Sequence, residues 1–356
     1  MDRPPDTRRF DGAALQSFAQ GLLERAGMPA DKAAVVAEIL IEGDLLGHET
    51  HGLQLLSGYL EDIGSGAMMT QGEPQVVADQ GAALTWDGRR LPGPWLMLQA
   101  IDAACERALR LGIGAVVVRH SHHIAALAPY ARRVAERGMV LLLMTSAPSG
   151  GSVAPYGGTR ALFSPSPIGV GIPTGGQPIL VDVSTSITTN GLTSLLAREG
   201  RRLPGPWLMD EHGTATDDPT VAVAPRRGTL LPLGGMDAGH KGYGLGLMVE
   251  ALTAGLAGHG RSDPGARFGA TLFVQVLDPA AFGGAPAFAG QMDWIVDRCH
   301  ENPPLDPARP VRLPGERGLA LRREQLAQGV VRLNARIVQA LARWSSQLDV
   351  PLPPAL

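Results

Sequence analysis

The spacing of apolar residues predicts two helices at the start of the chain. Apolar side chains recur every three or four positions from residue 15 to residue 23, which places them on one face of a helix. A second helix should begin near Asp31, whose side chain can cap it, and should end near Gly47. We therefore expect His48 and His51 at, or just beyond, the C-terminal end of this second helix.

Further along the chain, short apolar runs predict buried strands. They occupy residues 115–118, 139–144 and 179–183, and they are bounded by glycine or polar residues. Helices are expected over about 94–111 and 124–137, before and after the first of these runs. Strands that alternate with helices in this way are typical of the α/β class.

Two more helices are predicted in the second half of the chain. One should span about 243–256. The apolar spacing from 326 to 344 predicts an amphipathic helix with Val330 and Leu333 on its apolar face. Residues 62–94 are rich in glycine and in polar turn-forming residues, so we interpret them as a segment that crosses between parts of the molecule.

These elements predict an organisation in three parts. Residues 1–75 should form a helical segment, residues 76–290 an α/β core, and residues 291–356 a C-terminal segment whose helix packs back on the N-terminal part. The sequence of residues 88–97 is repeated at 200–209, but the flanking residues differ, so it does not indicate a repeat architecture.

Composition and charge exclude several classes of protein. The chain of 356 residues is 44% hydrophobic and 18% charged, and its net charge of −3 gives no general attraction to nucleic acid or to an anionic membrane. No apolar run reaches the roughly 18 residues of a membrane span, and the N-terminus lacks the apolar stretch of a secretory signal. Cys105 and Cys299 stand far apart in no metal-like or redox-like spacing, so we expect a cytoplasmic protein.

A strong preference for arginine singles out one lysine. Of the 31 basic residues, only Lys32 and Lys241 are lysines. A lysine kept against this preference suits a role that needs a compact point charge. Lys241 lies in residues 239–244, Gly-His-Lys-Gly-Tyr-Gly, at the predicted start of the helix over 243–256. Glycines, a lysine and a helix N-terminus together predict an anion site that suits phosphate.

Histidines form two further candidate clusters. His48 and His51 could transfer protons, because an unperturbed imidazole titrates at about 6.5, although surface or helix-capping histidines have the same pattern. Residues 120–123, His-Ser-His-His, directly follow the first predicted strand, where sites collect in open α/β sheets. A metal site, as in a metal-dependent hydrolase, is the alternative for these three histidines. No neighbouring cysteine, aspartate or glutamate completes such a ligand set, and we predict no metal.

The third predicted strand ends in a further candidate cluster. Asp182 is followed by the hydroxyl-rich residues 184–186. The carboxylate could orient a histidine and the hydroxyls could bind phosphate, while an aspartate that caps a turn is an equally good interpretation. The dinucleotide fingerprint Gly-x-Gly-x-x-Gly is absent, because residues 169–171 and 242–244 come nearest and neither has the third glycine. The motifs therefore do not support a Rossmann domain.

Several short segments, in order along nearly the whole chain, resemble the malate/L-lactate dehydrogenase family. They are residues 50–52 (Thr-His-Gly), 119–123, 154–158, 181–186, 203–210, 216–219, 239–245 and 314–316. This family lacks a Rossmann fold and includes ureidoglycolate, sulfolactate and diketogulonate dehydrogenases and cyclic-imine reductases. Each segment alone is a weak match, whereas the whole series in the same order is specific.

The resemblance implies a fold and a reaction. The fold would be α/β, with a non-Rossmann NAD(P)-binding domain on a mixed or antiparallel sheet and a helical domain from the N- and C-terminal segments. The protein would be a homodimer that transfers hydride between NAD(P)H and a 2-oxo acid or a cyclic imine. His51 would be the general acid and base, Asp182 would orient it, and His123 would lie beside the substrate.

The resemblance also assigns binding residues. The cofactor would contact Pro178, Ile179, Leu180, Val181, Asp182, Val183, Ser184, His240, Lys241, Gly315, Glu316 and Arg317. The substrate would contact Thr50, Leu55, His123, Thr145, Ser146 and Ala147. The acidic residue that follows a Rossmann strand has no equivalent to read here, so the choice between NADH and NADPH stays open.

The substrate side departs from the family pattern more than the cofactor side does. Leu55 stands where the family commonly has an arginine that pairs with the substrate carboxylate. Residues 145–147 read Thr-Ser-Ala instead of Thr-Asn-Ser, and 164–167 read Ser-Pro-Ser-Pro instead of Gly-Thr-Asn-Pro. Residues 124–125 replace Phe-Gly by Ile-Ala, and Leu192 replaces a lysine. We therefore expect a larger, less acidic carbonyl or imine substrate of specialised metabolism. The alternatives are an ordinary 2-hydroxy acid dehydrogenase and a catalytically silent homologue that acts as a binding subunit.

Overall fold

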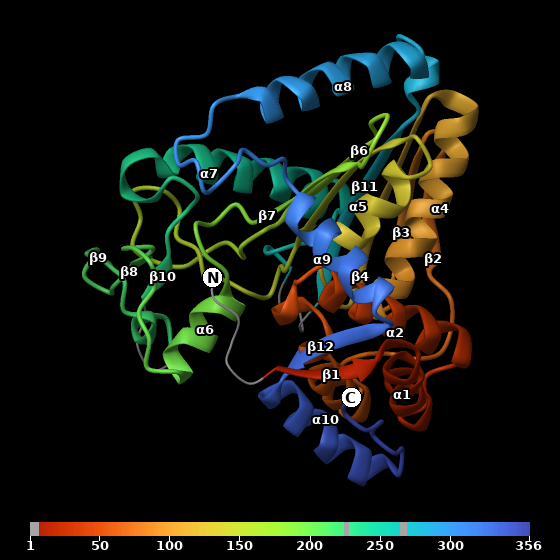
Figure 1. Cartoon of the computed structure of the whole chain (residues 1–356), viewed down its shortest axis with the longest axis vertical. Coiled ribbons are helices and arrows are strands. Elements are labelled where there is room, and N and C mark those ends of the chain that lie inside the picture. Colours follow the sequence, from red (N-terminus) through yellow and green to blue (C-terminus); the bar gives the residue numbers. More distant parts are fainter. Residues whose placement is uncertain (1–6, 224–227, 264–268) are drawn as a thin grey trace.

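The computed structural model of the chain describes residues 7–223, 228–263 and 269–356. Its centre is a seven-stranded sheet in the order β2-β3-β4-β11-β5-β6-β7 (Figure 1). The strands of this sheet are β2 (Gln75–Gln80), β3 (Ala83–Asp87), β4 (Ile113–Ser121), β5 (Val140–Ser146), β6 (Ile168–Ile172), β7 (Ile179–Val183) and β11 (Ala270–Leu277). Strands β3 and β4 run parallel, and the other neighbouring pairs of this sheet are antiparallel. The expected α/β class with a mixed, non-Rossmann sheet is confirmed.

Helices and two smaller sheets surround this centre. The α-helices of the described residues are α1 (Gly12–Arg25), α2 (Ala30–Leu45), α3 (Leu56–Gly64), α4 (Gly93–Leu111), α5 (Ala128–Ala135), α6 (Asn190–Arg198), α7 (Gly235–Glu250), α8 (Ala285–Glu301), α9 (Glu316–Ala327) and α10 (Ala335–Leu348). The smaller sheets pair β1 (Thr7–Asp11) with β12 (Val330–Asn334), and β8 (Leu208–Met209) with β9 (Ala215–Thr216) and β10 (Thr229–Leu230). Within the described ranges, no helix has the length and apolar character that a membrane crossing needs.

The main sheet is covered on both faces, which explains the apolar runs in its strands. Leu272 and Val274 of β11 join the largest core cluster together with residues of α1, α2, α4 and α5. Phe273, between them, joins a second cluster with Val249 of α7. Successive side chains of a strand point to opposite faces. Helices α4 and α5 therefore cover one face, and the end of α7 covers the other.

The two ends of the described chain lie together. Strand β1 is antiparallel to β12, and Leu333 and Leu341 share the largest core cluster with Leu15 (Figure 1). The C-terminal segment thus lies against the N-terminal helices. The domain boundaries expected at residues 75 and 290 stay predictions, and α8 runs across the second of them.

The amphipathic helix expected from residue 326 begins only at Ala335. Val330 and Leu333 lie in β12 instead. Gly329, with a left-handed φ of 65°, follows the end of α9, and β1 then provides a partner strand. Asn334 caps α10, because its side-chain oxygen accepts the backbone N–H of Ile337, in the first turn of the helix, at 3.0 Å.

Other boundaries also differ from the sequence prediction. Residues 62–94 contain β2 and β3, so they are part of the main sheet rather than a simple crossing segment. Helix α7 begins at Gly235 instead of near residue 243. Ala238 departs from helical geometry with φ −121° and ψ 17°, so Lys241 lies in the regular helix that starts just after it. Strand β11 falls in a segment for which the sequence patterns predicted no element.

Two other predicted helix starts need smaller corrections. Helix α2 begins at Ala30, with Pro29 in the capping position and Asp31 in the first turn. Helix α5 begins at Ala128 and not at residue 124, because residues 122–127 form an irregular link between β4 and this helix.

Candidate active site

Strand register brings several of the predicted site segments to one edge of the main sheet. Ala270 at the start of β11 pairs with Ser121 at the end of β4, and the next residue of β11 pairs with Ser146 at the end of β5. Ile168 at the start of β6 pairs with Val183 at the end of β7. The residues that follow β4, β5 and β7 therefore leave the sheet at the same edge.

His51 reaches this edge from a short 3₁₀ turn that follows α2. The loop approaches the end of α2 closely, because a side chain at Gly52 would clash with the carboxyl group of Asp44. The Asp44 carboxyl accepts the Leu53 N–H at 2.8 Å and is buried. Burial raises the pKa of Asp44 well above its usual range. The position of His51 is thus set by a buried acid and a glycine.

The imidazole rings of His51 and His123 are stacked. Their centroids lie 5.9 Å apart with an interplanar angle of 22°. The Thr50 hydroxyl lies 2.9 Å from Nδ1 of His51. Burial lowers the pKa of His51, the Asp182 carboxylate opposes this, and His48 adds to the lowering. Burial therefore favours the neutral ring of His51, and the Asp182 carboxylate favours the protonated ring.

His123 is held on its Nδ1 side. The Ala125 N–H donates to Nδ1 at 3.2 Å, and the Tyr59 hydroxyl lies 2.9 Å from the same nitrogen. A ring whose Nδ1 accepts a backbone N–H carries its proton on Nε2 when it is neutral. Burial, with smaller contributions from His51 and His122, lowers the pKa of His123 to about 3. His123 is therefore a neutral ring with an Nε2–H donor.

The Asp182 carboxylate is held by the start of α5, and its expected role in orienting His51 stays a prediction. Its Oδ2 accepts the N–H groups of Leu127 and Ala128 at 2.9 and 3.0 Å, at the start of α5. The same oxygen lies 4.0 Å from Nδ1 of His48. Among the described contacts, none is a hydrogen bond between Asp182 and His51. Asp182 acts on His51 through its charge and fixes α5 at the sheet edge.

Two of the predicted cofactor segments, residues 178–184 and 315–317, lie side by side. The Leu180 N–H donates to the Pro314 carbonyl at 3.1 Å. Gly315 has φ 88° at the start of α9, and a Cβ there would lie 2.6 Å from the Cβ of Leu180. The helix N-terminus can approach the strand this closely because residue 315 is glycine. Free amides at such a terminus suit a phosphate group.

The third cofactor segment, His240 and Lys241, is exposed on α7. Helix α7 rests on the residues that follow β7, because the Leu233 N–H donates to the Thr185 carbonyl at 2.8 Å and the Gly242 N–H donates to the Leu233 carbonyl at 3.1 Å. The first segment thus contains β7, residues 315–317 lie beside its beginning, and α7 rests on the residues that follow its end. Their glycines, helix terminus and lysine are groups that fit a dinucleotide diphosphate.

The three histidines of residues 120–123 take separate partners. His120 lies 3.0 Å from Asp87, and His122 lies 2.9 Å from Asp62. His123 contacts Tyr59, as described above. In the residues that the structure describes, no group of three or more His, Cys, Asp or Glu side chains could hold a metal ion.

The predicted substrate residues lie on three different segments of the chain. Leu55 is partly buried against the largest core cluster and carries no charge. Thr50 lies next to Gly191 at the start of α6, where a Cβ would come within 3.4 Å of the threonine. Residues 145–147 follow or end β5 at the same sheet edge.

Sequence reasoning missed several groups that shape the site. They are Asp44, Tyr59, Glu250 and Arg261. Asp44 is a charged residue inside the apolar end of α2, and this unusual placement was a usable signal. Tyr59, Glu250 and Arg261 had no such signal, because their roles depend on contacts with distant segments.

The family model for malate/L-lactate dehydrogenase matches residues 10–342. The chain belongs to the malate/L-lactate dehydrogenase family. It is 31% identical to an L-lactate dehydrogenase of Cupriavidus necator, over 96% of this chain and 98% of that protein. The enzyme class expected from the sequence, an NAD(P)-dependent oxidoreductase, is confirmed by this membership.

Solved structures of this family share the fold. The Δ1-piperideine-2-carboxylate reductase of Pseudomonas syringae pv. tomato has a TM-score of 0.83 at 30% identity, over 95% of this chain and 99% of that one. The malate dehydrogenase of Pyrococcus horikoshii OT3 has a TM-score of 0.87 at 26% identity, over 99% and 98% of the two chains. The chain is thus similar both to relatives that are named for a hydroxy acid and to one that is named for a cyclic imine.

Proposed function

We propose that this family member is a reductase that uses NADH or NADPH to reduce the C=O or C=N bond of a small molecule, with His51 as general acid and base. One observation carries the proposal. His51 and His123 are stacked 5.9 Å apart at the sheet edge where β7 ends. Residues 178–184 contain this strand, and residues 315–317 lie beside it.

The proposed chemistry needs one proton beside the reacting bond. A bound reduced nicotinamide supplies the hydride that adds to the substrate carbon. His51 donates a proton to the substrate oxygen or nitrogen in reduction, and its neutral ring accepts this proton in oxidation. The Asp182 carboxylate raises the pKa of His51 against the effect of burial, which supports the protonated form that reduction requires.

His123 has a different role in this proposal. Its Nδ1 is occupied by the Ala125 amide and approached by the Tyr59 hydroxyl, so its Nε2–H is the group available to the substrate. A neutral donor can hold the substrate oxygen or nitrogen in place without carrying a charge. His51 moves the proton, and His123 positions the atom that receives it.

Residues 178–184, 315–317 and His240–Lys241 would hold the cofactor. Fluorescence titration of the purified protein with NADH and with NADPH tests this, and it also decides between the two nucleotides. We expect binding of at least one, with affinity reduced about tenfold in Lys241→Ala, since a point charge near a phosphate is lost. Binding of neither nucleotide contradicts the proposal and favours a catalytically silent homologue.

The substrate should be larger and less acidic than pyruvate or oxaloacetate. Leu55 offers an alkyl group against the core, where an arginine would bind a carboxylate in two hydrogen bonds. Steady-state assays with pyruvate, oxaloacetate and Δ1-piperideine-2-carboxylate test this point. Turnover of either 2-oxo acid with kcat/KM above about 10⁵ M⁻¹ s⁻¹ would instead indicate an ordinary 2-hydroxy acid dehydrogenase.

We also propose that the protein is a cytoplasmic homodimer whose second copy covers α7 and α8. Helix α8 has no buried residue, and its Trp294 is 62% exposed. Leu247 and Met248 on α7 are exposed as well, and Figure 1 shows both helices in the upper part of the molecule. Large exposed apolar patches mark interfaces. Light scattering should give the mass of a dimer, and Trp294→Glu should shift it toward the monomer.

The free thiols Cys105 and Cys299 support the proposed cytoplasmic location, because the cytoplasm is a reducing compartment.

A further inference from the structure

A partly buried ion pair lies beside the predicted substrate segments. Nη2 of Arg261 and Oε1 of Glu250 are 2.7 Å apart, and the two side chains are 18% and 14% exposed. Glu250 is the last residue of α7, which continues into the π-helical turn Ala251–Gly255 before the chain reaches Arg261. Such turns are rare and frequently lie at functional sites.

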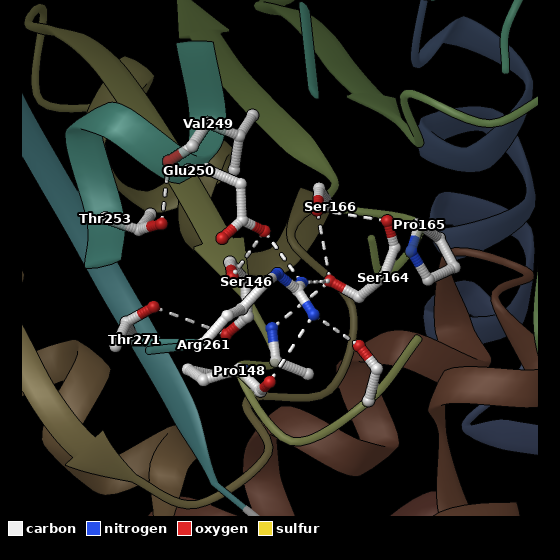
Figure 2. A network of polar contacts seen from close by, with 12 residues as sticks. Ser146, Pro148, Ser164, Pro165, Ser166, Val249, Glu250, Thr253, Arg261 and Thr271 are labelled. Carbon is white, nitrogen blue, oxygen red and sulfur yellow. Dashed lines mark hydrogen bonds and ion pairs between the residues drawn. The ribbon is translucent and has the colours of Figure 1, made fainter. Parts of the chain in front are cut away.

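This ion pair holds the loop that follows β5 (Figure 2). The Arg261 guanidinium donates to the Gly150 carbonyl at 2.6 Å and to the Pro148 carbonyl at 3.4 Å. The Ser146 hydroxyl donates to Oε1 of Glu250 at 2.9 Å. The loop of residues 146–150 is therefore attached to the pair at its beginning and at its end.

The same pair reaches the turn that precedes β6. Nη2 of Arg261 lies 3.4 Å from the Ser164 hydroxyl, which also accepts the Ala147 N–H at 3.2 Å. The Ser166 hydroxyl lies 3.0 Å from that of Ser164 (Figure 2). Ser166 is buried and has φ 42°, a strained value for a residue other than glycine. The network holds this turn in a conformation that the backbone alone would not favour.

These contacts coincide with the places where the substrate side departs from the family pattern. Residues 145–147 and 164–167 carry those departures, and Glu250 and Arg261 join the two segments. Both Nη atoms of Arg261 are engaged by protein oxygen atoms. The guanidinium is thus committed to the protein and does not replace the arginine that is absent at Leu55.

We infer that Arg261 and Glu250 are positioning residues that set the shape of the substrate side by joining the 146–150 loop to the 164–166 turn. The effect on substrate rests on the proposed function, whereas the attachment of the two segments does not. The pair acts through Ser146 and Ser164 and leaves the proton transfer to the histidines.

Hydrogen exchange of the full chain tests the attachment directly. Arg261→Met should speed amide exchange in residues 146–150 and 162–166 by about tenfold, because both segments lose charge-assisted hydrogen bonds. Arg322→Met is the matched control, since Arg322 forms a similarly buried ion pair with Glu42, at 2.8 Å, between α9 and α2. Unchanged exchange in Arg261→Met, or an equal increase in the control, would overturn the inference.

Kinetics on the best substrate among pyruvate, oxaloacetate and Δ1-piperideine-2-carboxylate tests the effect on the site. Arg261→Met should raise KM about tenfold, while kcat and the Kd of NADH or NADPH change less than about twofold. Glu250→Gln keeps an oxygen for Ser146 and should have a smaller effect. A fall in kcat at unchanged KM contradicts a positioning role. If wild-type protein binds neither nucleotide, the proposed function fails, and the exchange experiment still decides whether the pair joins the two segments.

Discussion

The Tyr59 hydroxyl lies 2.9 Å from Nδ1 of His123 and donates to the carbonyl oxygen of the same residue at 3.1 Å. One side chain of α3 thus contacts both the ring and the backbone of this histidine. Ala125 donates its N–H to the same ring while it has φ 61°, a conformation that glycine adopts without strain. Ala125 keeps this strained conformation, and its N–H makes the contact that fixes the tautomer of His123.

Tyr59→Phe should lower kcat/KM about tenfold, because His123 loses one hydrogen-bond partner that holds its ring. The Kd for the nucleotide should stay unchanged, since the hydrogen bonds of the Tyr59 hydroxyl go to His123. Ala125→Gly is the control, because it keeps the N–H and removes the strain. Full activity in Tyr59→Phe would show that the Ala125 amide alone orients His123.

His51→Asn should lower kcat by roughly a hundredfold to ten-thousandfold, the range expected for loss of a general acid. Nucleotide binding should be retained. His212→Asn is a suitable control, since the His212 side chain is 80% exposed and lies in the turn that follows β8. Steady-state kinetics and fluorescence titration check both parts, and wild-type kcat in His51→Asn would remove this residue from the mechanism.

The free energy of unfolding should fall as the pH is lowered from about 6.5 toward 3. The pKa of His123 is about 3 in the folded chain and about 6.5 when unfolded, so between these values the unfolded chain binds a proton that the folded chain does not. The decrease should reach about 1.4 kcal/mol per pH unit. Urea unfolding at pH 7 and pH 5 measures it, and His123→Gln should have a flatter dependence than wild type.

Gly52→Ala should destabilise the protein by at least about 2 kcal/mol, because the added methyl group clashes with the buried carboxyl group of Asp44. Activity should fall with it, since the neighbouring His51 must move. Gly58→Ala is the matched change, because its Cβ would lie in open space on α3. That variant should be neutral or more stable by about 0.5–1 kcal/mol. Equal melting temperatures of the two variants would contradict the packing argument.

The repeated decapeptide shows why local sequence predicts only part of the fold. Its last residues are helical in 88–97, where α4 starts, and form β8 in 200–209. The following residues decide the difference. After the first copy, helix-forming residues continue to Leu111. After the second copy, Asp210 accepts the N–H groups of His212 and residue 214 and closes a turn.

Local sequence likewise predicts only part of the candidate site. The histidines and the glycine-rich segment could be predicted, because residue type and order along the chain carry that information. The partners of Asp182 could not, because Leu127 and Ala128 are distant in sequence and only the packing of β7 on α5 brings them together. The ion pair of Glu250 and Arg261 could not be predicted from the sequence for the same reason.

The position of β11 has a consequence for how the chain acquires its structure. This strand lies between β4 and β5, although both are synthesised well before it. Two strand edges that face each other must therefore remain unpaired until residue 277 has left the ribosome. We expect the late pairing of β11 to limit the rate of folding, and chains that end before residue 270 should expose two strand edges that favour aggregation.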